Sequence, residues 1–155
     1  MFKRLLYASC ILLLVTALVV GYAGREANRV PKEMETYYNQ FIEAFSEGTF
    51  DDIKPFLHFE IEEYQQLMEH YFSNIRNVQL ESWERINDDL WVANTYVETD
   101  TEPEGNLTHY FVGKVDGEMR IMIGVFQVPD ELVDGEDLSR FISPDTLIPG
   151  QFVIS

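Results

Sequence analysis

Residues 107–126 read LTHYFVGKVDGEMRIMIGVF, and this stretch decides the fold. Apolar residues recur with the period of a β-strand on both sides of Asp116-Gly117. A type I′ turn needs positive φ at both central residues, and Asp-Gly is a favoured pair for it. The stretch therefore predicts an antiparallel hairpin with strands at 107–115 and 118–128.

The two-residue turn also determines which residues face each other across the hairpin. Phe111 is then opposite Met122, and His109 is opposite Gly124. A titratable side chain opposite a glycine indicates space for a ligand or for acid–base chemistry, so His109 and Gly124 are candidate pocket residues. The alternative is a hydrogen-bonded core histidine beside a glycine that allows the sheet to curve.

The segments before the hairpin place helices first and strands second. Apolar residues recur at helical spacing over 31–46 and over about 60–72. A short helix is expected from Phe50, with Asp51 as its cap. Period-two patterns predict strands at 76–86 and 90–99. This order is typical of an α+β fold with two to three helices packed on a four-stranded antiparallel sheet.

The stretch 37–53, YYNQFIEAFSEGTFDDI, adds a resemblance at the level of pattern. A long helix, a break at Gly48 and a short acidic helix, followed by the hairpin, resemble the NTF2-like (cystatin-like cone) family over roughly residues 31–128. The resemblance implies a curved sheet that wraps the first helix around a conical cavity. Members of that family include small enzymes, ligand binders and non-catalytic assembly domains. Membrane-tethered members recur in bacterial secretion and conjugation machinery.

The N-terminus indicates a membrane. Residues 5–23, LLYASCILLLVTALVVGYA, carry no charge, and a helix needs about 20 such residues to cross a bilayer. Lys3 and Arg4 precede them, which favours a single-pass anchor in the cell membrane with the C-terminal domain outside. The alternative is a signal peptide that is cleaved after Ala23, which would give a secreted protein. The expected organisation is an anchor or signal at 1–23, a linker at 24–30, the NTF2-like domain at 31–128, and a C-terminal extension at 129–155 packed on it.

Charge and cysteine content exclude several partners and chemistries. Residues 31–155 hold seven Lys/Arg and 26 Asp/Glu, a net charge of −19, so nucleic acid is not an expected partner. The favoured interpretation of this charge is a solvated, self-repelling surface, and the alternative is a surface for cationic ligands or basic partners. Cys10 is the only cysteine, which leaves the outer domain without a disulfide, a thiolate metal site or a cysteine nucleophile. The absence of bridges in an exported domain favours a bacterial surface protein.

No motif in the chain names a catalytic chemistry or a cofactor. The acidic cluster at 130–137 provides oxygen atoms, but its spacing does not match an EF-hand loop, so calcium is the weaker alternative and we expect no metal. Walker, G-x-G-x-x-G, G-x-S-x-G and C-x-x-C motifs are absent from the sequence.

Aromatic residues on the predicted strands and first helix fill the cone or line it. The residues concerned are Tyr38, Trp83, Trp91 and Tyr96. Two functions follow. The favoured one is non-catalytic binding of a partner protein or a small ligand by a membrane-tethered domain. The alternative is a small cone-fold enzyme that uses His109 as general base or acid.

Overall fold

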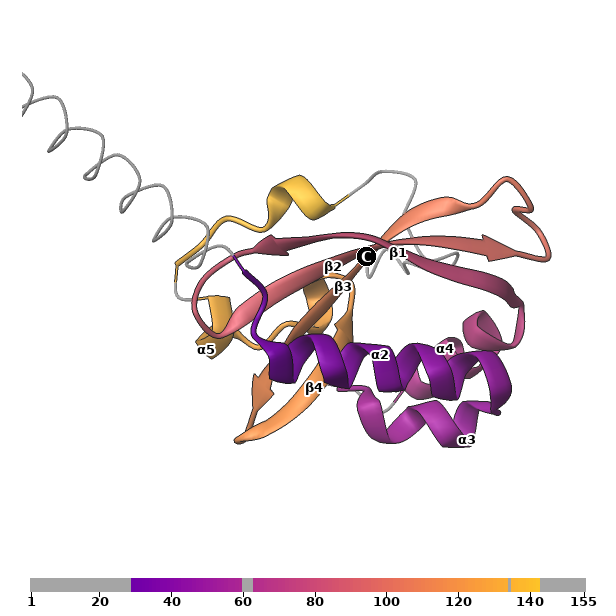
Figure 1. Ribbon diagram of the computed structural model, residues 1–155, viewed down its shortest axis with the longest axis horizontal. Coiled ribbons are helices and arrows are strands. Elements are labelled where there is room, and N and C mark those ends of the chain that lie inside the picture. Colours follow the sequence, from indigo (N-terminus) through magenta and orange to yellow (C-terminus); the bar gives the residue numbers. More distant parts are fainter. Residues whose placement is uncertain (1–28, 60–62, 134, 143–155) are drawn as a thin grey trace, which may run out of the picture.

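The computed structural model describes residues 29–59, 63–133 and 135–142, which form an α+β fold (Figure 1). One sheet has the order β1-β2-β3-β4, and every neighbouring pair is antiparallel. Its strands are β1 (Ile75–Arg85), β2 (Leu90–Thr99), β3 (Asn106–Val115) and β4 (Glu118–Ile123). The helices before it are α2 (Lys32–Glu47), α3 (Phe50–Ile53), η1 (Lys54–Phe56) and α4 (Glu63–Ser73); after it come η2 (Val125–Gln127), α5 (Asp130–Val133) and η3 (Ser139–Phe141). The α+β class and the four antiparallel strands predicted from the sequence are confirmed.

Helix α2 begins directly after Pro31, which is the N-cap residue and whose carbonyl accepts the first helical hydrogen bond from the Glu35 N–H at 3.1 Å. Its apolar stripe is spaced by four and three residues, so one side of the helix is buried against the sheet. The helix ends before Gly48, where a Cβ would lie 2.5 Å from the Ala44 carbonyl oxygen. A glycine is therefore required at this break.

The short helix α3 is capped by Thr49 and not by Asp51 as the sequence suggested. The Thr49 N–H and hydroxyl donate to the Asp52 carboxylate at 2.7 and 2.9 Å. These bonds satisfy a free backbone donor at the helix start and hold the pKa of Asp52 below its usual value. The prediction failed because several polar residues lie next to the helix start, and only the loop geometry selects the one that caps it.

The hairpin register agrees with the prediction from Val115 opposite Glu118 to Phe111 opposite Met122. Asp116 and Gly117 have φ of 52° and 79°, as a type I′ turn requires. Strand β4 is shorter than predicted, because Gly124 has φ of 80° and the chain enters η2 there. The expected pairing of His109 with Gly124 is therefore wrong.

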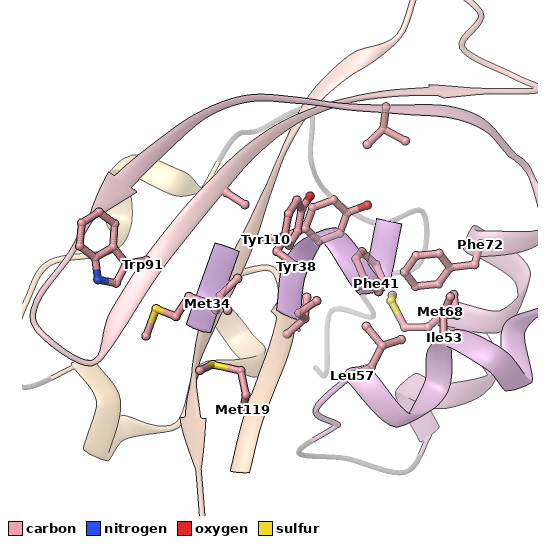
Figure 2. Close-up of a cluster of buried hydrophobic side chains, with 14 residues drawn as sticks. Met34, Tyr38, Phe41, Ile53, Leu57, Met68, Phe72, Trp91, Tyr110 and Met119 are labelled. Atoms are coloured by element: carbon pink, nitrogen blue, oxygen red, sulfur yellow. The ribbon is translucent and has the colours of Figure 1, made fainter. Parts of the chain in front are cut away.

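Both faces of the sheet are covered, but by different segments (Figure 1). Helices α2, α3 and α4 cover the inner face, whose buried cluster includes Tyr38, Phe41 and Tyr110 (Figure 2). The segment from η2 to η3 covers part of the outer face, where Phe111 and Phe141 are buried. The alternation of side chains along each strand thus places neighbouring residues in two separate cores.

No helix among the described residues is long and apolar enough to cross a membrane. The anchor or signal expected over residues 5–23 lies outside the described residues, and so does the end of the predicted extension, residues 143–155.

Candidate functional site

The candidate residues from the sequence lie on opposite faces of the sheet. Tyr38, Trp83 and Trp91 belong to the inner core. His109 lies on the outer face, where its ring contacts Phe141. Tyr96 also points outward, because its neighbour Val97 is in the inner cluster. The structure therefore does not bring the six candidates together in one pocket.

Tyr38 is at the centre of the inner core and is fully buried (Figure 2). Its hydroxyl lies 2.5 Å from the Thr95 Oγ1, and the Thr95 hydroxyl donates to the Ala93 carbonyl at 3.1 Å. Because the Thr95 proton is engaged by Ala93, the Tyr38 hydroxyl is the donor between the two side chains. Burial raises the pKa of Tyr38 well above its usual value, so it remains protonated as long as the fold persists.

Aromatic rings occupy the space between α2 and the sheet (Figure 2). The Phe41 ring packs edge-on against Tyr110 at 5.9 Å and against Phe72 at 6.2 Å, measured between ring centres. The Trp83 ring meets Tyr38 edge-on at 5.3 Å. A region packed in this way is a filled core rather than a chamber for a ligand.

Three polar atoms in this core are buried without a hydrogen-bond partner among the described residues: the Nε1 atoms of Trp83 and Trp91 and the hydroxyl of Tyr110. The Tyr71 side chain is nevertheless a hydrogen-bonding neighbour of the Tyr110 hydroxyl, in a geometry poorer than that of a standard hydrogen bond, and burial raises the pKa of both phenols. Each of these donors loses hydration on folding, and such groups cost free energy when they lack a partner.

His109 is half-buried and is oriented by an amide rather than a carboxylate. Its Nδ1 lies 2.8 Å from the Asn94 Oδ1, while the Asn94 amide donates to the Ser82 Oγ at 3.1 Å. Asn94 therefore presents its oxygen to the ring, which places the His109 proton on Nδ1 and leaves Nε2 with a free lone pair in the neutral form.

Burial lowers the pKa of His109, and the negative charge of Glu84 opposes that shift in part. Glu84 itself is paired with Arg140 at 2.8 Å, and the Arg140 guanidinium also lies 4.7 Å from the centre of the Phe141 ring. The neutral form of His109 is thus favoured, and the Phe141 ring meets the His109 ring edge-on at 5.2 Å between centres.

Gly124 begins the turn that ends β4. Its φ of 80° is in the left-handed region, and an added Cβ would meet no atom within 4 Å. The glycine is therefore explained by its backbone conformation and not by close packing.

A shallow groove that the sequence did not indicate runs between α2 and β4, with a volume of about 420 Å³. It is lined by Lys32, Glu33, Thr36, Tyr37, Gln40 and Met119. Lys114 pairs with Glu33 at 3.2 Å in the same region. In the sequence, the α2 residues of this groove have the pattern of an ordinary solvated helix face. The opposite wall comes from Met119 of β4, which is far away along the chain, so the groove cannot be recognised from the sequence.

No group of three or more His, Cys, Asp or Glu side chains that could hold a metal ion occurs in the described part of the chain. In the acidic cluster that was the alternative calcium site, the Asp137 carboxylate instead accepts the Ser139 N–H at 2.9 Å. This bond lowers the pKa of Asp137 and gives the carboxylate a local role in starting η3.

Comparisons with known proteins leave the family open. No protein family matches the sequence, and no curated protein is similar to it. Among solved structures, the chain is similar to a de novo designed protein with a curved β-sheet, with a TM-score of 0.42 and 11% identity over 68% of this chain and 95% of that one. This likeness carries no argument about function.

Proposed function

We propose that this protein is a membrane-tethered, extracytoplasmic domain of the NTF2-like (cystatin-like cone) type that binds a partner protein without catalysing a reaction. The uncharged run at 5–23 behind Lys3 and Arg4 supports the tether and its orientation. The order of helices followed by a four-stranded meander supports the fold type.

The observation that carries the non-catalytic proposal is the filled inner core. Tyr38 and Tyr110 are fully buried and Phe41 is 1% exposed, so the rings that would line a cone occupy it instead. An enzyme that binds a small substrate in such a fold needs a concave chamber with a few polar groups directed into it. A filled core has no chamber for a small substrate, so we infer that the protein binds its partner through its surface.

The surroundings of His109 favour the same conclusion. A general base of the histidine type is commonly oriented by a carboxylate and must reach a reacting proton. Here Nδ1 is held by the Asn94 amide, and the nearby carboxylate of Glu84 is engaged by Arg140. Phe141 also lies against the ring.

The charge of the domain indicates the chemistry of the partner. Arg76, Lys114 and Arg120 pair with acidic residues of the same chain. Because residues 31–155 carry 26 acidic and only seven basic residues, most carboxylates lack such a partner. A basic protein surface is complementary to this field, and association with it would weaken as the salt concentration rises.

Complementation of cells that lack the protein tests the proposal. We expect a gene carrying His109→Asn to correct fully the defect that loss of the protein causes. The introduced asparagine amide can still donate to Asn94, but it cannot act as a base near neutral pH. Phe41→Ala is the matched control for loss of function, since it removes a ring from the core and should fail. If His109→Asn keeps the wild-type melting temperature but fails to complement, the cone-enzyme alternative is favoured and the proposal is wrong.

A further inference from the structure

The three large apolar side chains that are clearly exposed among the described residues lie around one end of the sheet. Leu107 is 48% exposed, Phe126 is 60% exposed and Ile142 is 47% exposed. We name these three residues the apolar patch. Single exposed apolar residues are ordinary, but a group at one place marks a surface that another segment covers.

Strand geometry places Leu107 close to Ile142, and Phe126 at the same end of the sheet. Leu107 and His109 are two residues apart on β3 and share its outer face, and the Phe141 ring meets the His109 ring edge-on at 5.2 Å between centres. Ile142 directly follows Phe141. Ile123 of β4 pairs with Tyr110, which is three residues beyond Leu107 on β3. Phe126 follows Ile123 by three residues, so the chain leaves β4 towards Phe126 at the end of the sheet where Leu107 lies.

The covered part of the outer face ends where the patch begins. The η2-to-η3 segment buries Phe111, Met122 and Phe141 in one cluster. Phe141 also contacts Phe111 edge-on at 5.4 Å, which anchors the chain at this point. The chain therefore continues from Ile142 directly beside uncovered apolar surface.

The next thirteen residues, 143–155, have the composition that such a surface binds. They include Leu147, Ile148, Phe152, Val153 and Ile154. Their only charged side chain is Asp145, so the acidic body repels them little. Leu147 is five residues beyond Ile142, a span of at most about 18 Å, whereas Leu107 is about 7 Å along the strand from His109.

We propose that residues 143–155 dock on the apolar patch and extend the cover of the outer face over Leu107 and His109. The tether to Phe141 makes this association intramolecular, which favours it over a separate partner of similar composition. Docking would exclude solvent from the His109 ring. The inference does not depend on the proposed function.

Disulfide trapping in the full chain tests the docking. Because Cys10 is the only cysteine, a Cys10→Ser background carries no competing thiol. Leu107→Cys is combined with Leu147→Cys in one variant and with Phe152→Cys in another. The control variants replace Leu107→Cys by Gln40→Cys, since Gln40 is exposed on α2, which covers the opposite face of the sheet. Phe126→Cys provides a second position on the patch.

Under mild oxidation, we expect at least one tail cysteine to form an intramolecular disulfide with position 107 or 126 on the order of tenfold faster than with position 40. Equal rates at the patch and at position 40 would overturn the proposal, and a separate protein that occupies the patch would give that same result. Thermal melting provides an independent measurement. Leu107→Ser should lower the melting temperature of the full chain more than that of a chain ending at Ile142, and equal shifts would contradict docking.

Discussion

Tyr38 and Tyr110 allow a direct test of the hydrogen bonding inside the inner core, because the same substitution, Tyr→Phe, is expected to change stability in opposite directions at the two positions. Both side chains are fully buried in one cluster. The Tyr38 hydroxyl donates to Thr95, whereas the Tyr110 hydroxyl makes no hydrogen bond of standard geometry among the described residues and has only Tyr71 beside it. Replacing either with Phe removes one oxygen atom and keeps the ring.

Tyr38→Phe should destabilise the fold by about 1 kcal/mol, the usual net contribution of one buried hydrogen bond. The Thr95 hydroxyl keeps its bond to the Ala93 carbonyl at 3.1 Å, so no donor is left without a partner and the loss should not exceed this value greatly. Tyr110→Phe removes a hydroxyl that is desolvated and is compensated only by its poorly oriented neighbour Tyr71. It should leave stability unchanged or raise it by up to about 1 kcal/mol.

Urea unfolding followed by the fluorescence of Trp83 and Trp91 measures both effects. For a chain of this size the slope is about 1.5 kcal/mol per M, so 1 kcal/mol moves the midpoint by roughly 0.7 M. Tyr96→Phe, at a partly buried position on the outer face, is the control and should change stability by less than about 0.5 kcal/mol. If Tyr110→Phe destabilises as much as Tyr38→Phe, the Tyr110 hydroxyl is bonded, with Tyr71 as the nearest donor or acceptor, and the reasoning is refuted.

Three further predictions concern the outer face and the membrane topology. Because burial lowers the pKa of His109, the unfolded chain binds more protons than the folded chain just below about pH 6.5, and the stability of the wild type should fall there more than that of His109→Asn. Urea midpoints of both proteins at pH 7.5 and 5.5 measure the difference, and an equal fall in the two midpoints would contradict it. Gly105→Ala should cost more stability than Gly124→Ala. Both glycines have positive φ, so the backbone strain of an alanine is about 1–2 kcal/mol at either site, but only at Gly105 would the added Cβ overlap the Tyr96 ring. Equal losses of stability in urea unfolding would argue against the overlap. Protease added to intact cells or spheroplasts should digest residues 24–155, and protection in verified right-side-out samples would exclude the extracytoplasmic orientation.

The sequence predicted the elements better than their contacts. The strands, the α2 stripe and the hairpin register around Asp116-Gly117 follow from periodicity and turn chemistry, which act over a few residues. The end of β4 was missed because the apolar pattern continues past Gly124, although the backbone does not. The cap of α3 was missed for a similar reason, since loop geometry selects Thr49 over its acidic neighbour.

The candidate site was predicted less well, because it depends on segments that are far apart along the chain. A strand pattern assigns His109 to one face, but it does not say that Asn94 from β2 holds its Nδ1 and that Phe141 covers its ring. Likewise, the sequence left open whether the aromatic residues line a cavity or fill a core. The packing of α2 against the inner face decides this, since the rings of Tyr38 and Phe41 enter the space themselves.

What the sequence by itself determined is therefore local: the helical and strand periods, the two-residue turn, the acidic surface, and the uncharged run that predicts a membrane segment. Only the tertiary structure decided which residues share a core, which polar groups have partners and where β4 ends. The physical reason is that backbone preferences act between near neighbours, whereas burial and hydrogen-bond partners arise when distant segments pack together.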